Sequence, residues 1–141
     1  MTERYLDPTQ EAAVALFQRN IDGPVVMLNL LRFRDVADYS ATPELAPDRP
    51  VSGAEAYDAY IAHTLPFLEA SGGEMMFLVE GGPFLICPAD ERWDCAMLVR
   101  QASLDAFMSF AENDAYLKGI LHRTSAIEDS RLLPLEARSL D

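Results

Sequence analysis

An apolar run from Pro24 to Arg34 dominates the hydrophobic pattern of the chain. The run has no helical spacing and lies between Asp22-Gly23 and Asp35, so it predicts a β-strand. Both faces of this strand are apolar, because alternate positions give Val25, Met27, Leu31 and Phe33 on one side and Val26, Leu28 and Leu30 on the other. A strand with two apolar faces belongs in the middle of a sheet that is covered on both sides.

Helical and alternating patterns predict the other elements of the chain. They are a helix from Asp7 to Asn20, a helix from Ser52 to Ser71, strands from Glu74 to Val79 and from Trp93 to Gln101, helices from Ser103 to Glu112 and from Asn113 to Arg123, and a last strand from Glu128 to Glu136. After the first helix the order is β-α-β-β-α-β, which is typical of the ferredoxin-like α+β fold with a four-stranded antiparallel sheet. We expect one domain over residues 1–141, with a helix extension at 1–22, a loop at 35–51 and a frayed tail at 137–141.

The predicted fold leaves one face of the sheet without helices. Because both faces are apolar, a single copy would expose a wide apolar surface, which monomers seldom do. We therefore predict a homodimer in which two sheets face each other, a dimeric α+β barrel with an interior pocket for a small-molecule ligand. In this hypothesis the second copy covers the face that carries Met27 and Met97.

The charge balance restricts the partners of the chain. There are 11 basic and 23 acidic side chains, and the resulting net charge of −12 argues against binding to nucleic acid or to an anionic membrane. No apolar window is long enough to span a membrane, and the N-terminus lacks the core of a signal peptide. Cys87 and Cys95 have neither zinc nor disulfide spacing, so we expect reduced thiols in a cytoplasmic protein, with no metal and no cofactor.

Three segments resemble the family called domain of unknown function 1330. They are Gly23–Phe33, Arg92–Asp94 and His122–Leu132, and the likeness extends from Gly23 to Pro134. The resemblance implies a dimeric ferredoxin-like α+β barrel but no particular activity. Related barrels include cofactor-independent monooxygenases, lactone isomerases and haem enzymes, and a reaction transferred from them on fold alone is an analogy.

Asn29 interrupts the apolar strand and is the first candidate site residue. A buried amide needs hydrogen-bond partners, and asparagine is disfavoured in strands. Its amide could bond to the neighbouring backbone and fix the strand register. It could also face the barrel interior and hold a carbonyl or hydroxyl group of a substrate.

Arg123 follows the apolar stripe of the last predicted helix and is the second candidate. Arginine at this position could interact with the helix dipole or pair with Asp94, Glu128 or Asp129. It could instead bind a carboxylate ligand through two parallel hydrogen bonds. We expect Arg123, and not its neighbour His122, to face the cleft.

The remaining candidates are His63, Tyr60 and Trp93. Tyr60 and His63 are three positions apart on one helix and can share a face. Histidine is the usual acid or base in a cavity, although a surface or core-edge position is the simpler alternative. Trp93 could stack on a flat ligand or anchor the core.

These candidates support two hypotheses. In the first, the protein is a cofactor-independent enzyme, monooxygenase- or isomerase-like, that acts on a small carbonyl or carboxylate compound. Asn29 would hold an oxygen, His63 or Tyr60 would move a proton, and Arg123 would neutralise an anion. In the second, the protein is a non-catalytic small-molecule-binding or dimerisation module.

Overall fold

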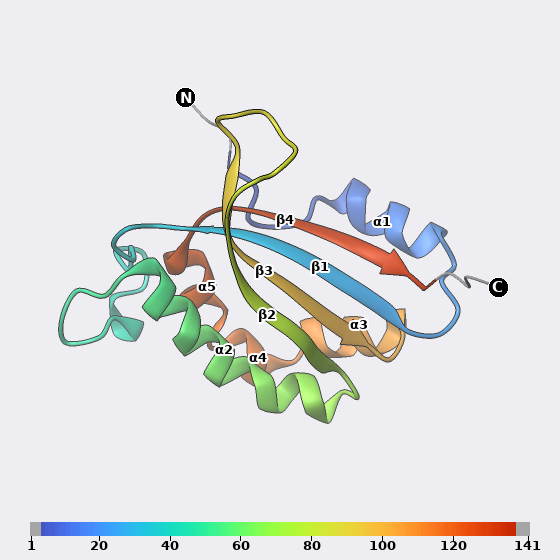
Figure 1. The fold of residues 1–141 in the computed structure, drawn as a ribbon. Helices are drawn as coiled ribbons and strands as arrows, with labels where there is room; N and C mark the ends of the chain where they lie inside the picture. Colours follow the sequence, from blue (N-terminus) through green and yellow to red (C-terminus); the bar gives the residue numbers. More distant parts are fainter. Residues whose placement is uncertain (1–3, 138–141) are drawn as a thin grey trace.

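The computed structural model describes residues 4–137 of the chain. The elements are α1 (Gln10–Gln18), β1 (Val25–Phe33), the 3-10 helix η1 (Pro43–Leu45), α2 (Gly53–Ala70), β2 (Glu74–Pro83), β3 (Arg92–Gln101), α3 (Leu104–Ala111), α4 (Asp114–Leu117), α5 (Ile120–Ala126) and β4 (Ile127–Glu136) (Figure 1). The predicted tail lies outside the described residues except for residue 137. Among residues 4–137, every helix is too short or too polar to span a lipid bilayer.

The four strands form one antiparallel sheet in the order β2-β3-β1-β4. The helices α2 to α5 lie on one face of this sheet (Figure 1). This arrangement confirms the predicted α+β ferredoxin-like fold. It also places β1, the strand with two apolar faces, in the interior of the sheet as its pattern requires.

Local signals in the sequence explain most helix boundaries. Ser52 accepts a hydrogen bond from the Glu55 backbone, and the Glu55 side chain accepts one from the Ser52 backbone, so the predicted capping box begins α2. The side chain of Thr9, and not the predicted Asp7, caps α1. The predicted helix from Asn113 to Arg123 is divided into α4 and α5 at Gly119.

The helix side of the sheet holds the main core. Met27 is 2% exposed and Met97 is 6% exposed, and both belong to a cluster that includes Tyr57 and Tyr60 of α2. The Tyr57 hydroxyl contacts the sulfur of Met97 at 3.9 Å. The prediction that a second copy covers Met27 and Met97 is therefore wrong, because the helices of the same chain cover them.

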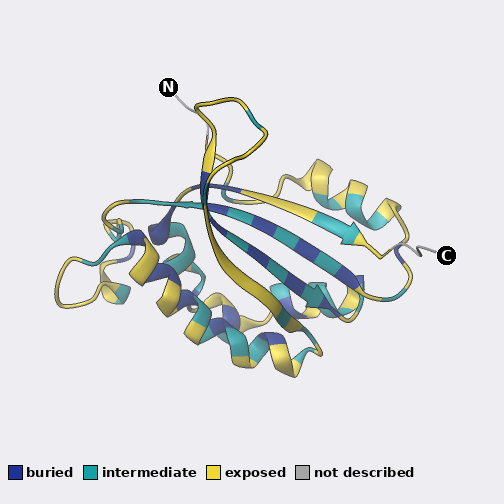
Figure 2. Cartoon of the chain, viewed as in Figure 1, coloured by how far each residue is buried: buried dark blue, intermediate teal, exposed yellow. Residues whose placement is uncertain are grey.

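The opposite side of the sheet, called here the open face, is not covered by any helix of residues 4–137. The strand registers place nine apolar side chains on it, namely Val26, Leu28, Leu30, Phe77, Val79, Ala96, Leu98, Leu133 and Leu135. Phe77 is 56% exposed and Leu133 is 53% exposed, and Figure 2 shows β2 and β4 as largely exposed strands on either side of β1 and β3. Charged residues flank this apolar surface, with Glu74 and Arg100 at one end and Arg32, Asp129 and Arg131 at the other.

Candidate functional site

Three buried tyrosines lie between the helices and the sheet. Tyr57 and Tyr60 are three residues apart on α2 and share one helix face, and their rings are 5.2 Å apart. Tyr116 of α4 approaches from the side, and its hydroxyl oxygen lies 2.8 Å from that of Tyr60. We call these three residues, with His63 and Arg123, the tyrosine cluster.

His63 lies one turn after Tyr60 on α2 and binds the backbone of α4. Its Nε2 is 2.9 Å from the Ala115 carbonyl oxygen and 3.1 Å from that of Tyr116. A carbonyl oxygen can only accept a hydrogen bond, so Nε2 carries a proton. In the neutral ring Nδ1 is then the basic nitrogen, and it has no hydrogen-bond partner among residues 4–137.

Arg123 of α5 brings a positive charge to the cluster. Its Nη1 donates to the Leu6 carbonyl oxygen at 2.7 Å, and its Nη2 donates to the Ser130 hydroxyl at 3.4 Å. Burial raises the pKa of Tyr57 and of Tyr116 far above the ordinary value, while the Arg123 charge acts in the opposite direction. Both phenols are therefore protonated donors near neutral pH.

The three carboxylates proposed as partners of Arg123 do not bind it. Within the described chain, Asp94 pairs with Arg92, and Asp129 pairs with Arg32 and Arg131. Arg123 itself forms no ion pair with a described carboxylate. Its guanidinium charge is thus not neutralised locally by an acidic side chain.

Asn29 lies on the helix side of β1, in register with Met97 on β3. Its amide nitrogen donates to the Met27 carbonyl oxygen at 3.2 Å, which is the backbone bond of the structural alternative. The amide oxygen accepts no hydrogen bond from a described residue. Because Met97 contacts Tyr57, Asn29 lies one side chain away from the tyrosine cluster.

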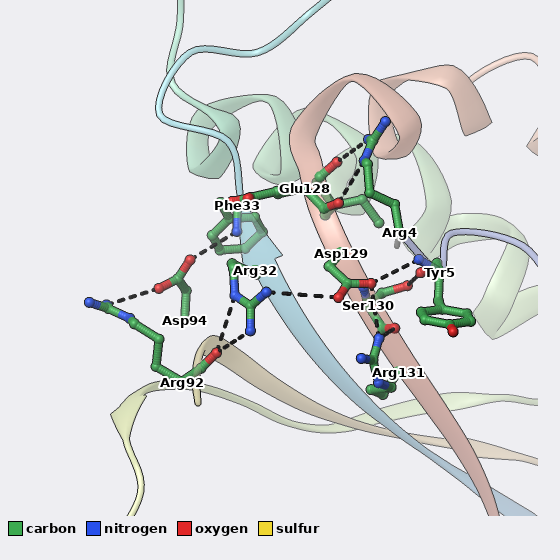
Figure 3. Close-up of polar contacts among 11 residues, drawn as sticks. Arg4, Tyr5, Arg32, Phe33, Arg92, Asp94, Glu128, Asp129, Ser130 and Arg131 are labelled. Carbon is green, nitrogen blue, oxygen red and sulfur yellow. Dashed lines mark hydrogen bonds and ion pairs between the residues drawn. The ribbon is translucent and has the colours of Figure 1, made fainter. Parts of the chain in front are cut away.

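Trp93 belongs to a different site. The guanidinium carbons of Arg32 and Arg131 lie 4.5 Å and 4.9 Å from the centre of its ring. The indole is buried at 4% exposure but is not part of the core cluster on the helix side. We call Arg32, Trp93, Asp129 and Arg131, with Tyr5 of the N-terminal segment, the arginine cluster; Figure 3 shows its polar contacts.

The structure therefore brings together three of the five predicted site residues. Tyr60 contacts the Tyr116 hydroxyl, His63 contacts its backbone carbonyl, and the charge of Arg123 acts on its phenol. Asn29 lies nearby on β1, and Trp93 is separate. Two shallow hollows lie along the outer side of α1 and contain none of these residues. No group of three or more His, Cys, Asp or Glu side chains between residues 4 and 137 is placed to bind a metal ion.

Comparison with solved structures identifies the relatives of the chain. RPA0582, a protein of unknown function from Rhodopseudomonas palustris, is 36% identical over 97% of this chain and 99% of that protein, with a TM-score of 0.81. A second structure, of methylated RPA0582, is 35% identical over 99% of this chain and 98% of that one, with a TM-score of 0.83. The chain belongs to the RPA0582 family. No family model matches the chain, and no curated protein matches it.

More distant structures share the fold of the RPA0582 family. SnoaB, a cofactor-independent oxygenase from Streptomyces nogalater, is 14% identical over 84% of this chain and 96% of its own, with a TM-score of 0.52. A dimeric ferredoxin-like protein of unknown function from Jannaschia sp. CCS1 is 13% identical over 82% of this chain and 100% of its own, with a TM-score of 0.52. At this identity the similarity establishes the fold alone.

Sequence reasoning missed two partners in the site. Tyr116 was expected only as part of an apolar stripe, and its hydrogen bond to Tyr60 depends on how α4 packs against α2. The sequence favours Arg123 over His122, yet the Nδ1 of His122 is 2.7 Å from the hydroxyl of Tyr39 in the 35–51 segment. Burial and the nearby His63 lower the pKa of His122.

Proposed function

We propose that the protein is a homodimeric, cofactor-independent enzyme that transfers a proton on a small carbonyl or carboxylate compound. The observation that carries this proposal is the Tyr60–Tyr116 hydroxyl pair beside the charge of Arg123 and the imidazole of His63. We also propose that the RPA0582 family falls within the domain of unknown function 1330. SnoaB, which shares the fold, is described as a cofactor-independent oxygenase, and this is consistent with cofactor-independent chemistry on this fold.

The chemistry requires a base and a site for negative charge. Nδ1 of His63 takes a proton from the carbon next to the carbonyl, and the electron pair moves onto the carbonyl oxygen to give an enolate. The phenol of Tyr116 donates a hydrogen bond to this oxygen, and the Arg123 charge stabilises it. Asn29 holds a second oxygen of the substrate through its amide.

Substrate binding needs α4 to move. Tyr60 is 8% exposed and Tyr116 is 6% exposed, so a ligand reaches their hydroxyls only when the two rings separate. The break at Gly119 makes α4 a four-residue helix that is joined to α5 by a short turn. We place the entrance between α2 and α4, where the substrate oxygen takes the place of one hydroxyl in the tyrosine pair.

The open face supports the homodimer. Its centre is apolar and both of its ends are charged, which is the pattern of a protein interface with a polar rim. Val79 and Leu133 are 49% and 53% exposed in the single chain, and burying such side chains is favourable. The Jannaschia protein, which has the same fold, is described as dimeric, and this is consistent with a homodimer.

Proton exchange tests the activity without knowledge of the product. Acetoacetate, pyruvate and cyclohexanone are incubated with the protein in D2O, and loss of the proton signal next to the carbonyl is followed by NMR. We expect catalysed exchange of at least one compound and its loss in Tyr116→Phe. Arg49→Gln is the control, because Arg49 is a surface residue with an exposed ion pair to Glu55. Exchange that Tyr116→Phe leaves unchanged would contradict the proposed site.

A specific observation favours the non-catalytic module as the second candidate. The side chains of Asn29, His63 and Arg123 all bond to backbone carbonyl groups of the chain itself. Such bonds hold elements together without any ligand. A ligand that raises the melting temperature but shows no catalysed exchange would support this candidate, since binding to the native state alone raises the transition.

A further inference from the structure

The arginine cluster concentrates positive charge in a strongly acidic protein. The chain has only 11 basic side chains against 23 acidic ones, yet Arg32 and Arg131 of this cluster and the neighbouring Arg92 all lie where β1 ends and β3 and β4 begin. Among the described residues, Asp94 and Asp129 are the carboxylates that pair with them. Three arginines therefore share two paired carboxylates, which leaves guanidinium groups that can interact with an anionic partner.

Asp129 is a single carboxylate that is shared by two arginines. Its Oδ1 accepts hydrogen bonds from the Tyr5 and Ser130 backbone and from Nη1 of Arg131. Its Oδ2 is 3.8 Å from Nη1 of Arg32. Dashed lines in Figure 3 join the Asp129 carboxylate to the Arg32 guanidinium through Oδ2 and to the Arg131 guanidinium through Oδ1. One carboxylate thus faces two positive charges.

The outer edge of the Arg131 guanidinium is free. Nη1 donates to Asp129 and to the Ser130 carbonyl oxygen, whereas Nε and Nη2 have no hydrogen-bond partner between residues 4 and 137. The side chain is 47% exposed. The two free N–H groups lie side by side on one planar group, and this pair matches the two oxygens of a carboxylate.

The guanidinium is also held in position before any ligand binds. Its carbon lies 4.8 Å from the centre of the Tyr5 ring and 4.9 Å from the centre of the Trp93 ring. The ion pair to Asp129 fixes the inner edge of the same group. A ligand therefore loses little affinity to ordering of this side chain.

We propose that the arginine cluster binds a carboxylate that carries an apolar chain. The carboxylate takes the free edge of Arg131, and the chain lies over Leu30 and Leu133, which the strand register places beside Arg131 on the open face. Because the proposed homodimer buries Leu133 on the same face, the bound chain competes with the second copy at this end of the sheet. Leu133 is 53% exposed and supplies apolar contact. The site is at the charged rim of this face, and it does not depend on the proposed proton transfer.

The single tryptophan of the chain reports on this site. Trp93 fluorescence is titrated with octanoate, with octanamide as the uncharged analogue and acetate as the analogue without a chain. We expect saturable binding of octanoate to the wild-type protein and dissociation constants roughly tenfold higher or more for the other two. Equal affinity for octanamide and octanoate would overturn the proposal without any mutant.

A matched pair of variants separates the binding edge from general charge. Arg131→Lys keeps the positive charge but removes the planar pair of donors, so octanoate affinity falls by about tenfold. Arg100→Lys makes the same change at the opposite end of the open face and keeps the wild-type affinity. Wild-type affinity in Arg131→Lys, or an equal loss in both variants, would contradict the assignment. Tyr116→Phe is a separate test. If this variant loses proton exchange and still binds octanoate, the result bears on the proposed reaction and not on the carboxylate site.

Discussion

Met97 and Leu98 are adjacent on β3 and point to opposite faces of the sheet, so they give a stringent test of the proposed dimer. Burying a leucine side chain stabilises by about 1.5–3 kcal/mol. Leu98 is already partly buried in the single chain, so a twofold interface that contains it twice gains only about 1–2 kcal/mol from its burial, and burying two unpaired carboxylates in Leu98→Asp adds several kcal/mol. The dimer dissociation constant then rises by between about a hundredfold and ten-thousandfold, while each copy stays folded.

Met97→Asp has a different expected result. Met97 is 6% exposed beneath α2, and loss of its packing alone costs about 2–5 kcal/mol, to which an unpaired buried charge adds. That is a large part of the stability of a typical domain, so this variant melts early or fails to fold.

Sedimentation velocity over a range of concentrations and melting followed by circular dichroism distinguish the two effects. Val14→Asp is the control, because Val14 is 48% exposed on α1 and away from the open face. An unchanged dimer in Leu98→Asp would refute the proposed interface. A stable, folded Met97→Asp monomer would refute the assignment of the two faces.

Three further changes test individual contacts. Tyr116→Phe removes the 2.8 Å bond to Tyr60 and should lower the free energy of unfolding in urea by about 1 kcal/mol; no change would mean that the hydroxyl pair adds nothing to stability. Burial raises the pKa of Asp129, but backbone hydrogen bonds and Arg131 outweigh it and hold the pKa below the ordinary 3.8. The ionised Asp129 contributes to the free energy of unfolding above pH 3.8, and this contribution is lost as pH falls through the folded-state pKa. Asp129→Asn should therefore lower the free energy of unfolding at pH 7 and weaken its decrease in acid; an unchanged dependence of the free energy of unfolding on pH would contradict this. Gly119→Ala would place a methyl group against the His63 ring and should lower the melting temperature at a cost of roughly 1–3 kcal/mol, whereas an unchanged melting temperature would mean that the ring moves away freely.

The sequence pattern predicted the strands and their two faces but not which face the helices cover. The period of two separates Val26, Leu28 and Leu30 from Val25, Met27 and Leu31. Because both sets are apolar, alternation carries no information on which set lies inside the chain. The structure settles this point through Tyr57, whose hydroxyl contacts Met97 from the helix side.

The sequence predicts contacts in the candidate site only between residues that are close together in the chain. Tyr60 and His63 share a helix face because their spacing is three, and this relation follows from the sequence. The approach of Tyr116 depends on the break at Gly119, which lets α4 turn towards α2. Trp93 and Arg131 are distant in sequence, and no local pattern indicates that a guanidinium lies over the indole.

Consecutive residues of β4 connect the two clusters through the sheet. Asp129 and Arg131 belong to the open face, whereas Ser130 lies on the helix side in register with Leu31 and accepts a hydrogen bond from Arg123. The N-terminal segment adds a second connection, because the Tyr5 backbone binds Asp129 and Ser130 and the next carbonyl oxygen, of Leu6, accepts from Arg123. A displacement of Tyr5 therefore changes the surroundings of a guanidinium on each side of the sheet. The proposed assembly through the open face and the proposed chemistry at the tyrosine cluster therefore have a physical connection through this segment.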